Sequence, residues 1–129
     1  METKVGIKYT EEHEWAEQDG NKYKVGISDY AQTELGDIVY VEIPEVGRKV
    51  DKGEAFMVVE SVKAVSDIYA PIQGTIVEVN QSLEDAPEEI NSSPFDAGWL
   101  VVIESENAEQ YQAMMDAEKY QAFVAEISK

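Results

Sequence analysis

The strongest structural signal in the chain is the stretch Glu60-Ser-Val-Lys63-Ala-Val-Ser-Asp67 with its two flanks. Ala55–Glu60 (Ala-Phe-Met-Val-Val-Glu) is apolar and β-branched, which predicts a strand. Ser66–Tyr69 repeats this pattern in weaker form after a few small residues. Two strands joined by so short a connection predict a β-hairpin with Lys63 at its tip.

A Pro-x-x-Gly turn lies on either side of this hairpin. Pro44-Glu-Val-Gly47 follows the β-branched segment Ile38–Ile43, and Pro71-Ile-Gln-Gly74 precedes the alternating segment Thr75–Asn80. Gly47 precedes Lys63 by 16 residues, and Gly74 follows it by 11. The repeated turn indicates an internal duplication, with two β halves packed around a pseudo-twofold axis.

The chain before this region predicts a further hairpin and a short helix. Val5–Tyr9 and Lys22–Ile27 alternate apolar and polar residues, and a turn signal at Asp19-Gly20 lies between them. Ser28 is a favoured residue at the start of a helix, and Gly36 at its end. Together they predict one to two helical turns.

After the second Pro-x-x-Gly turn the pattern changes from strand to helix. A polar loop is expected over Gln81–Ala97, followed by the buried strand Trp99–Ile103. From Glu106 the chain is rich in Ala, Glu, Gln and Met, and Asp116 is placed to cap the second of two short helices. Apolar residues at helical spacing are expected to pack on the β core: Tyr111, Met114, Met115, Tyr120, Phe123, Val124 and Ile127.

Length and composition favour one domain over residues 1–129, and the segment patterns predict that it is mainly β, with a β core over about 5–103 and C-terminal helices over about 106–128. A chain of 129 residues with 43% hydrophobic residues can bury a core without disulfides or metal ions. It has no cysteine, which excludes disulfides, thiolate nucleophiles and cysteine-based metal sites.

Charge narrows the possible partners. Ten Lys and Arg residues against 27 Asp and Glu residues give a net charge of -17. So negative a surface repels phosphate backbones and anionic membranes, and neither nucleic acid nor a membrane is expected as a partner. No apolar stretch is long enough to cross a bilayer, and the N-terminus lacks an apolar signal core. We expect a monomer located in the cytoplasm.

Lys63 is the candidate functional residue, because no other cation occurs within ten residues on either side. An exposed amine on a tight turn suits covalent attachment of a cofactor, since a modifying enzyme can reach it and the attached arm can swing. An ordinary solvated lysine is the simpler interpretation, and the flanking turns outweigh it. Lipoyl- and biotinyl-carrier domains resemble this layout. Biotin carriers place Met on both sides of the lysine, whereas Val62 and Ala64 favour lipoate here.

Blocks spread over nearly the whole chain resemble the glycine cleavage H protein family. In order they are His13-Glu-Trp15, Val25-Gly-Ile27, Leu35-Gly-Asp37, Glu60–Gly74, Asn91-Ser-Ser-Pro94 and Gly98-Trp99. Separated blocks in the same order are far more specific than one short motif. The lipoyl domains of 2-oxoacid dehydrogenases usually have Asp before the lysine, where this chain has Val62. The resemblance implies a barrel-sandwich hybrid, the fold of lipoyl- and biotinyl-carrier domains.

The resemblance also implies a non-catalytic carrier with lipoate joined to Lys63 as an amide. The arm would receive the aminomethyl group of glycine at a pyridoxal-phosphate glycine decarboxylase and deliver it to a tetrahydrofolate-dependent aminomethyltransferase. Dihydrolipoamide dehydrogenase would then reoxidise the arm. A separate lipoate-attaching enzyme would join lipoate to the lysine beforehand. These reactions belong to glycine catabolism and one-carbon metabolism.

The same resemblance implies a role for two carboxylates. It places Glu14 and Asp67 beside the pocket that holds the aminomethyl-loaded arm, where a carboxylate favours a cationic amine. Where the family often has Ser before the His-Glu-Trp block, this chain has Glu12, which adds negative charge. His13 is the only histidine, and one imidazole makes a poor metal site. We therefore expect no metal and interpret His13 as a solvated neighbour of a core residue, Trp15.

Three alternatives remain open. A lipoyl relay that donates lipoate to other lipoyl proteins would use the same lysine, Lys63. A small hydrolase or isomerase with paired carboxylates is disfavoured, because no nucleophile, base and orienting group occur together. A structural adaptor without a cofactor is disfavoured only by the intact lysine in its intact surroundings.

Overall fold

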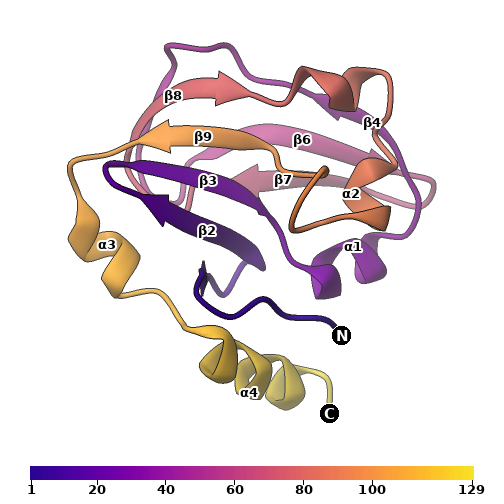
Figure 1. Cartoon of the computed structure of the whole chain (residues 1–129). Coiled ribbons are helices and arrows are strands. Elements are labelled where there is room, and N and C mark those ends of the chain that lie inside the picture. Colours follow the sequence, from indigo (N-terminus) through magenta and orange to yellow (C-terminus); the bar gives the residue numbers. More distant parts are fainter.

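Two antiparallel sheets form the body of the molecule, which the computed structural model describes over residues 1–129. The six-stranded sheet has the order β1-β2-β3-β9-β8-β5, and the three-stranded sheet has the order β4-β6-β7. In Figure 1 the three-stranded sheet lies behind the six-stranded one. This confirms the mainly β architecture expected from the sequence. The strands are β1 Lys8–Tyr9, β2 Glu14–Asp19, β3 Lys22–Ile27, β4 Ile38–Glu42, β5 Lys49–Val50, β6 Ala55–Ser61, β7 Val65–Tyr69, β8 Gly74–Val79 and β9 Val101–Glu104.

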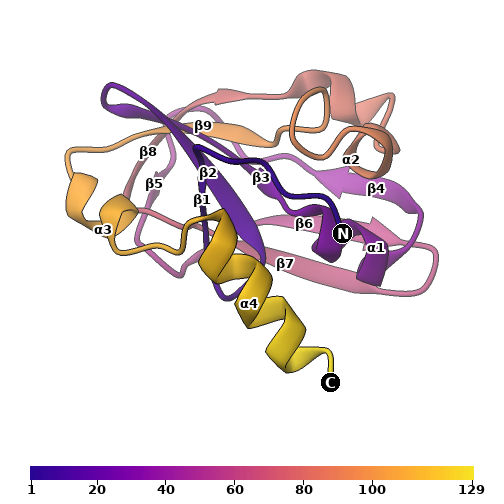
Figure 2. The same ribbon diagram turned by 60° about the horizontal axis from the view of Figure 1, so that its bottom comes forward.

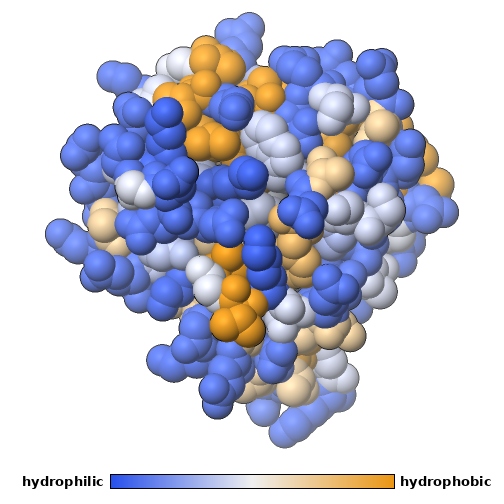
Figure 3. Space-filling model, viewed as in Figure 1, coloured by the Kyte–Doolittle hydropathy of each residue, from blue (hydrophilic) through white to orange (hydrophobic).

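Side chains from both sheets meet in one core of 21 buried residues. Val25 and Ile103 come from the six-stranded sheet, and Val59 and Ile68 from the three-stranded sheet. Burial of branched apolar side chains between two sheets contributes most of the favourable free energy of such a fold. The outer face, by contrast, is mainly hydrophilic in the view of Figure 3, with small scattered apolar patches.

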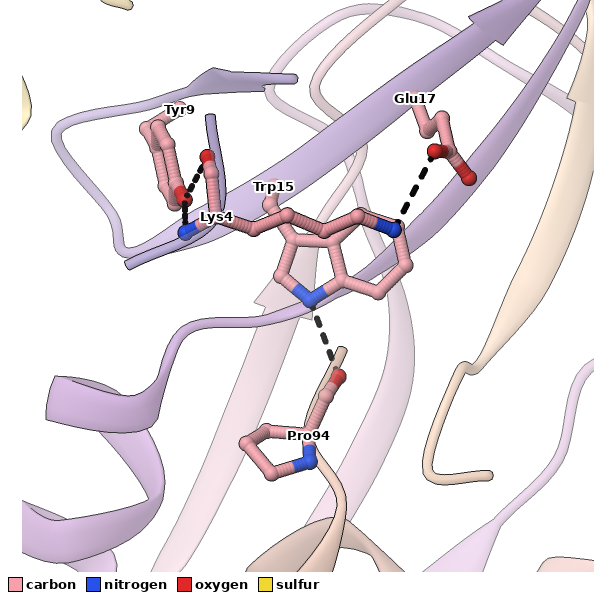
Figure 4. Close-up of polar contacts among 5 residues, drawn as sticks. All are labelled: Lys4, Tyr9, Trp15, Glu17 and Pro94. Carbon is pink, nitrogen blue, oxygen red and sulfur yellow. Dashed lines mark hydrogen bonds and ion pairs between the residues drawn. The ribbon is translucent and has the colours of Figure 1, made fainter. Parts of the chain in front are cut away.

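A second core joins β1 and β2 to the C-terminal helix α4 (Ala117–Ile127). Figure 2 shows α4 lying beside these two strands. Trp15 is 1% exposed, and its indole N–H donates to the carbonyl of Pro94 at 3.1 Å (Figure 4). The hydroxyl of Tyr9 accepts from the Lys4 N–H and donates to the Lys4 carbonyl, both at 2.8 Å. These bonds hold the N-terminal segment against the second core.

Side-chain caps begin the two helices where the sequence predicted them. Ser28 accepts a hydrogen bond from Ala31 at the start of α1 (Asp29–Leu35), and Gly36 ends that helix with φ +82°. Asp116 accepts from Lys119 at 2.8 Å and begins α4. The short helix α3 (Ala108–Gln112) precedes it. No helix combines the length and the apolar character needed to span a membrane.

The predicted C-terminal stripe packs on the strands except at its end. Tyr111, Met114, Tyr120 and Val124 are buried, whereas Ile127 at the end of α4 is 47% exposed.

Two expectations are wrong in detail. The first hairpin was expected to pair Val5–Tyr9 with Lys22–Ile27. Instead the turn at Asp19-Gly20 joins β2 to β3, and only Lys8–Tyr9 of the predicted first strand forms a strand, which pairs with β2. The first three residues of β2 are all buried, so this strand lacks the alternation by which strands are found. The expected polar loop contains η1 (Gln81–Glu84) and α2 (Glu89–Ser92), which bury Leu83 and Ile90.

Gly26 is expected to tolerate no side chain, because Trp15 packs against it. A Cβ built on Gly26 would lie 2.5 Å from Trp15 Cζ2, and the indole is fixed by its bond to Pro94. Gly26→Ala should lower the free energy of unfolding by about 3 kcal/mol, the upper end of the usual cost of overpacking. Urea denaturation measures this loss.

Gly20→Ala is the control for this substitution. Gly20 has φ +63° and no neighbour within 4 Å of a built Cβ, so Ala there costs only about 1 kcal/mol of backbone strain. Equal losses in the two variants would contradict the contact between Gly26 and Trp15.

Candidate functional site

Lys63 lies at the tip of the β6–β7 hairpin, as the sequence predicted. Ser61 N–H donates to the Ala64 carbonyl at 2.8 Å, and the Ser61 hydroxyl accepts from the N–H groups of Lys63 and Ala64 at 3.3 and 3.0 Å. Val62 N–H donates to the Asp37 carbonyl at 3.0 Å, which joins the turn to the residue before β4. None of these bonds uses the Lys63 side chain, which is exposed. The backbone is therefore fixed while the amine stays accessible.

The stem of Lys63 runs past the end of α1. A Cβ built on Gly36 would lie 3.4 Å from Lys63 Cε. Glycine at this position allows the positive φ that ends the helix, and the lysine stem lies beside it at ordinary van der Waals distance. Sequence reasoning found the role of Gly36 at the helix end but not its contact with Lys63, because that contact joins distant segments.

A hollow of about 560 Å³ lies between α1 and β7, beginning near the hairpin tip. Asp67, an exposed residue of β7, lines this α1–β7 hollow, so the structure places it beside the Lys63 hairpin. The other lining residues are Glu12, His13, Ile27, Tyr30, Ala31, Glu34, Leu35, Val65, Ser66, Ile68 and Tyr69. A volume of this size is in the range that holds a small organic group.

Glu14 lines a second hollow of about 410 Å³, which we call the Glu14 hollow. Its carboxylate is 2% exposed and accepts from the Thr10 hydroxyl at 2.6 Å and from the Tyr69 N–H at 3.3 Å. Met114 and Met115 from the segment before α4 form part of the wall. The sequence assigned these methionines to packing alone.

Glu14 and Asp67 thus line neighbouring hollows rather than a single one. Tyr69 and Glu12 line both, and they mark where the two hollows adjoin. Glu14 contacts β7 at Tyr69, two residues beyond Asp67 on the same strand. Along β7, Asp67 therefore lies nearer the Lys63 hairpin tip than the Tyr69 N–H that Glu14 contacts.

Burial raises the pKa of Glu14 to about 7. The hydrogen bonds from Thr10 and Tyr69 act in the opposite direction, and the nearby charge of Glu12 raises the pKa further. At neutral pH this carboxyl group is therefore close to half ionised. A cation placed beside it would favour the ionised form and lower the pKa. Glu14 is suited to respond to the charge of whatever enters the hollow.

His13 differs from its interpretation as a solvated neighbour of Trp15. Its Nδ1 lies 2.9 Å from the Tyr120 hydroxyl, and its backbone has φ +70°. Burial lowers the pKa of His13, while Glu12 and Glu34 act in the opposite direction. Trp15 is buried, as predicted. The two residues before it are not simply solvated, because His13 contacts Tyr120 and Glu14 is hydrogen-bonded to Thr10 and Tyr69.

The geometry fits a covalently bound arm: an exposed amine on a fixed turn, a stem that passes a glycine, and two adjoining hollows within a two-sheet β fold. The fold and site define a carrier domain of the lipoyl- and biotinyl-attachment class.

Comparisons with known proteins identify the family within this class. The family model described as glycine cleavage H-protein matches residues 7–127. The glycine cleavage system H protein of Anaeromyxobacter sp. (strain K) is 53% identical over 126 residues, covering 98% of both chains. That of Brevibacillus brevis is 52% identical over 126 residues, covering 98% of this chain and 100% of the relative. The chain belongs to the glycine cleavage H-protein family.

A solved structure agrees with this assignment. The crystal structure of a glycine cleavage system H protein from Mycobacterium marinum is similar, with a TM-score of 0.87 and 36% sequence identity. The match covers 95% of this chain and 99% of that one. The similarity therefore includes both sheets and most of the helical elements.

The raised pKa of Glu14 predicts a pH-dependent stability. Between its ordinary value of 4.5 and about 7, the folded protein binds more protons at Glu14 than the unfolded chain does. The free energy of unfolding should therefore fall as pH rises through this range. Relative to Glu14→Gln, the parent should lose on the order of 3 kcal/mol between pH 4.5 and pH 8.

Urea denaturation at several pH values measures this difference. Glu11→Gln, which changes an exposed carboxylate in the same segment, is the control and should keep the pH dependence of the parent. A stability difference between parent and Glu14→Gln that stays constant with pH would show that the Glu14 carboxyl is not perturbed by burial.

Proposed function

We propose that this chain is a lipoyl carrier of the glycine cleavage system that holds lipoate as an amide on Lys63. In this role it catalyses no step itself but moves the aminomethyl group of glycine between enzymes. The observation that carries the proposal is the hairpin tip, where a fixed backbone presents an exposed amine near the α1–β7 hollow, which adjoins the Glu14 hollow. Membership of the glycine cleavage H-protein family supports the same role.

The contribution of the protein is attachment and positioning. Lipoate, when attached, supplies a disulfide that can take up the aminomethyl group and a dithiol that can be reoxidised. Lys63 supplies the amine for the amide bond. Ser61 and Asp37 keep the attachment point still, so the free end of the arm stays at a high effective concentration near the hollows.

Glu14 and Asp67 are proposed to favour the loaded arm, which carries a cationic amine. Asp67 is exposed, so water screens its attraction and its contribution is small. Glu14 is buried and half ionised near pH 7, so a nearby amine would ionise it and form a charge-assisted hydrogen bond. Such a bond contributes on the order of 1.5–3 kcal/mol. Glu14 is therefore the stronger of the two groups.

Four partners follow from the proposal: a pyridoxal-phosphate glycine decarboxylase, a tetrahydrofolate-dependent aminomethyltransferase, dihydrolipoamide dehydrogenase and a lipoate-attaching enzyme. Apart from Lys63, the sequence has no Lys or Arg over residues 25–47 and 53–118. The hairpin region accordingly presents carboxylates such as Glu34 and Asp37, which suit partner surfaces rich in Lys and Arg. A lipoyl relay would use the same lysine, and no contact in the structure favours it.

Lys63→Arg tests the attachment site. Arginine keeps the charge but offers no amine for an amide bond, so a lipoate-attaching enzyme should add one lipoyl group to the parent and none to the variant. Intact mass and peptide mapping measure the adduct. The circular dichroism spectrum should stay unchanged, because the turn is held by backbone and Ser61 contacts.

Lys22→Arg is the matched control, since Lys22 is also an exposed lysine beside a hairpin turn. This variant should accept one lipoyl group on Lys63, like the parent. An adduct on any other lysine of the parent, or an adduct on Lys63→Arg, would contradict the proposed site.

A further inference from the structure

Tyr120 of α4 is fully buried, yet its hydroxyl contacts polar groups of two other segments. The hydroxyl oxygen lies 2.9 Å from His13 Nδ1 and 2.7 Å from Ser28 Oγ. Tyr120 is 0% and Ser28 1% exposed, so neither hydroxyl has access to solvent. Burial raises the pKa of Tyr120 to about 12, which keeps the group neutral at physiological pH. Removing the hydroxyl would leave the buried Ser28 hydroxyl and the half-buried His13 ring without this partner.

The two groups that Tyr120 joins belong to different walls of the α1–β7 hollow. His13 lines the hollow directly, together with its neighbour Glu12. Ser28 caps α1, which forms one side, by accepting from the Ala31 N–H at 3.1 Å. Tyr120 itself lines neither hollow. It therefore connects two walls of the hollow without lining the hollow itself.

The His13 segment needs such support, because its φ of +70° is a left-handed conformation that is strained for a residue other than glycine. His13 N–H donates to the Thr10 carbonyl at 3.1 Å, and its carbonyl accepts from Ser28 N–H at 2.9 Å. Its ring centroid lies 4.8 Å from that of Tyr30 on α1. A shift of His13 would move the adjoining residues Glu12 and Glu14, which line the hollows.

The ring of Tyr120 is held independently of its hydroxyl. It stacks on Tyr9 with centroids 4.5 Å apart and an interplanar angle of 4°. Tyr9 in turn exchanges two backbone hydrogen bonds with Met115, at 2.7 and 2.9 Å. Replacing Tyr120 by Phe should therefore remove the hydroxyl and leave the aromatic packing of α4.

We propose that Tyr120 is a positioning residue for the carrier: its hydroxyl holds the His13 segment against the start of α1 and so sets the shape of the hollow that receives the arm. This inference rests on the proposed function, because it requires an arm that enters the hollow. The effect on the arm is indirect, through His13 and Ser28.

The first test uses the protein without lipoate. Hydrogen exchange measured by NMR should be about fivefold faster at the amides of Ser28 and Ala31 in Tyr120→Phe than in the parent, the factor that corresponds to loss of about 1 kcal/mol. Tyr23→Phe is the control, because Tyr23 is 1% exposed and its hydroxyl bonds Gln18 at 3.0 Å in another part of the fold. It should leave both amides unchanged.

The second test uses the lipoylated protein loaded with glycine by the decarboxylase and then separated from it. Tyr120→Phe should release ammonia up to about fivefold faster than the parent, while the rate of lipoate attachment to Lys63 stays the same. Tyr23→Phe should match the parent in both rates. A positioning role would change the release rate alone. A general loss of stability would change the attachment rate as well.

Parent rates for both exchange and release in Tyr120→Phe would overturn the inference, as would equal acceleration in Tyr120→Phe and Tyr23→Phe. Release from the loaded parent as fast as from urea-unfolded protein would contradict the docking of the arm in the proposed function. The exchange rates, which need no arm, distinguish these two failures.

Discussion

The hydrogen bond from Val62 N–H to the Asp37 carbonyl joins the parts of the molecule on which the site depends. Asp37 follows Gly36, the residue that ends α1 and lies beside the Lys63 stem. One short connection thus fixes the hairpin tip relative to α1. Because α1 and β7 then form the two sides of one hollow, the proposed attachment point and the proposed resting place of the arm share a rigid frame.

Burial of Glu14 sets the electrostatic behaviour of this frame. A carboxylate that is 2% exposed costs stability when ionised, and only two hydrogen bonds offset that cost. In the proposed function the same cost would make the group selective, because a cationic amine restores the charge balance and a neutral arm does not. Asp67, in contrast, is exposed, so its proposed attraction for the arm would be weaker and screened by water.

Local signals in the sequence predicted the parts of the fold that depend on neighbouring residues. The hairpin at Lys63 and the caps at Ser28 and Asp116 follow from turn and helix preferences, and the structure has all three. The strand β2 was missed, because its consecutive buried residues show no alternation. Separation of the carboxylates of Glu14 and Asp67 into two hollows depends on how β7 packs against residues 10–14, which no local pattern records.

His13 shows a second limit of local reasoning. A lone histidine beside a tryptophan gives no sign of a left-handed backbone or of a tyrosine 107 residues away in the chain. The contact with Tyr120 exists only once α4 has packed on β1 and β2. Tertiary contact, rather than propensity, therefore decides the environment of the residues that border the site.

Backbone amide NMR of the lipoylated protein, compared between its oxidised and aminomethyl-loaded forms, tests whether the loaded arm rests between α1 and β7. Chemical shift changes are predicted at residues 12–14, 30–31, 34–35 and 65–69, which line the two hollows. Changes confined to the hairpin tip, residues 61–64, would show that the loaded arm stays in solvent and would contradict the proposed docking.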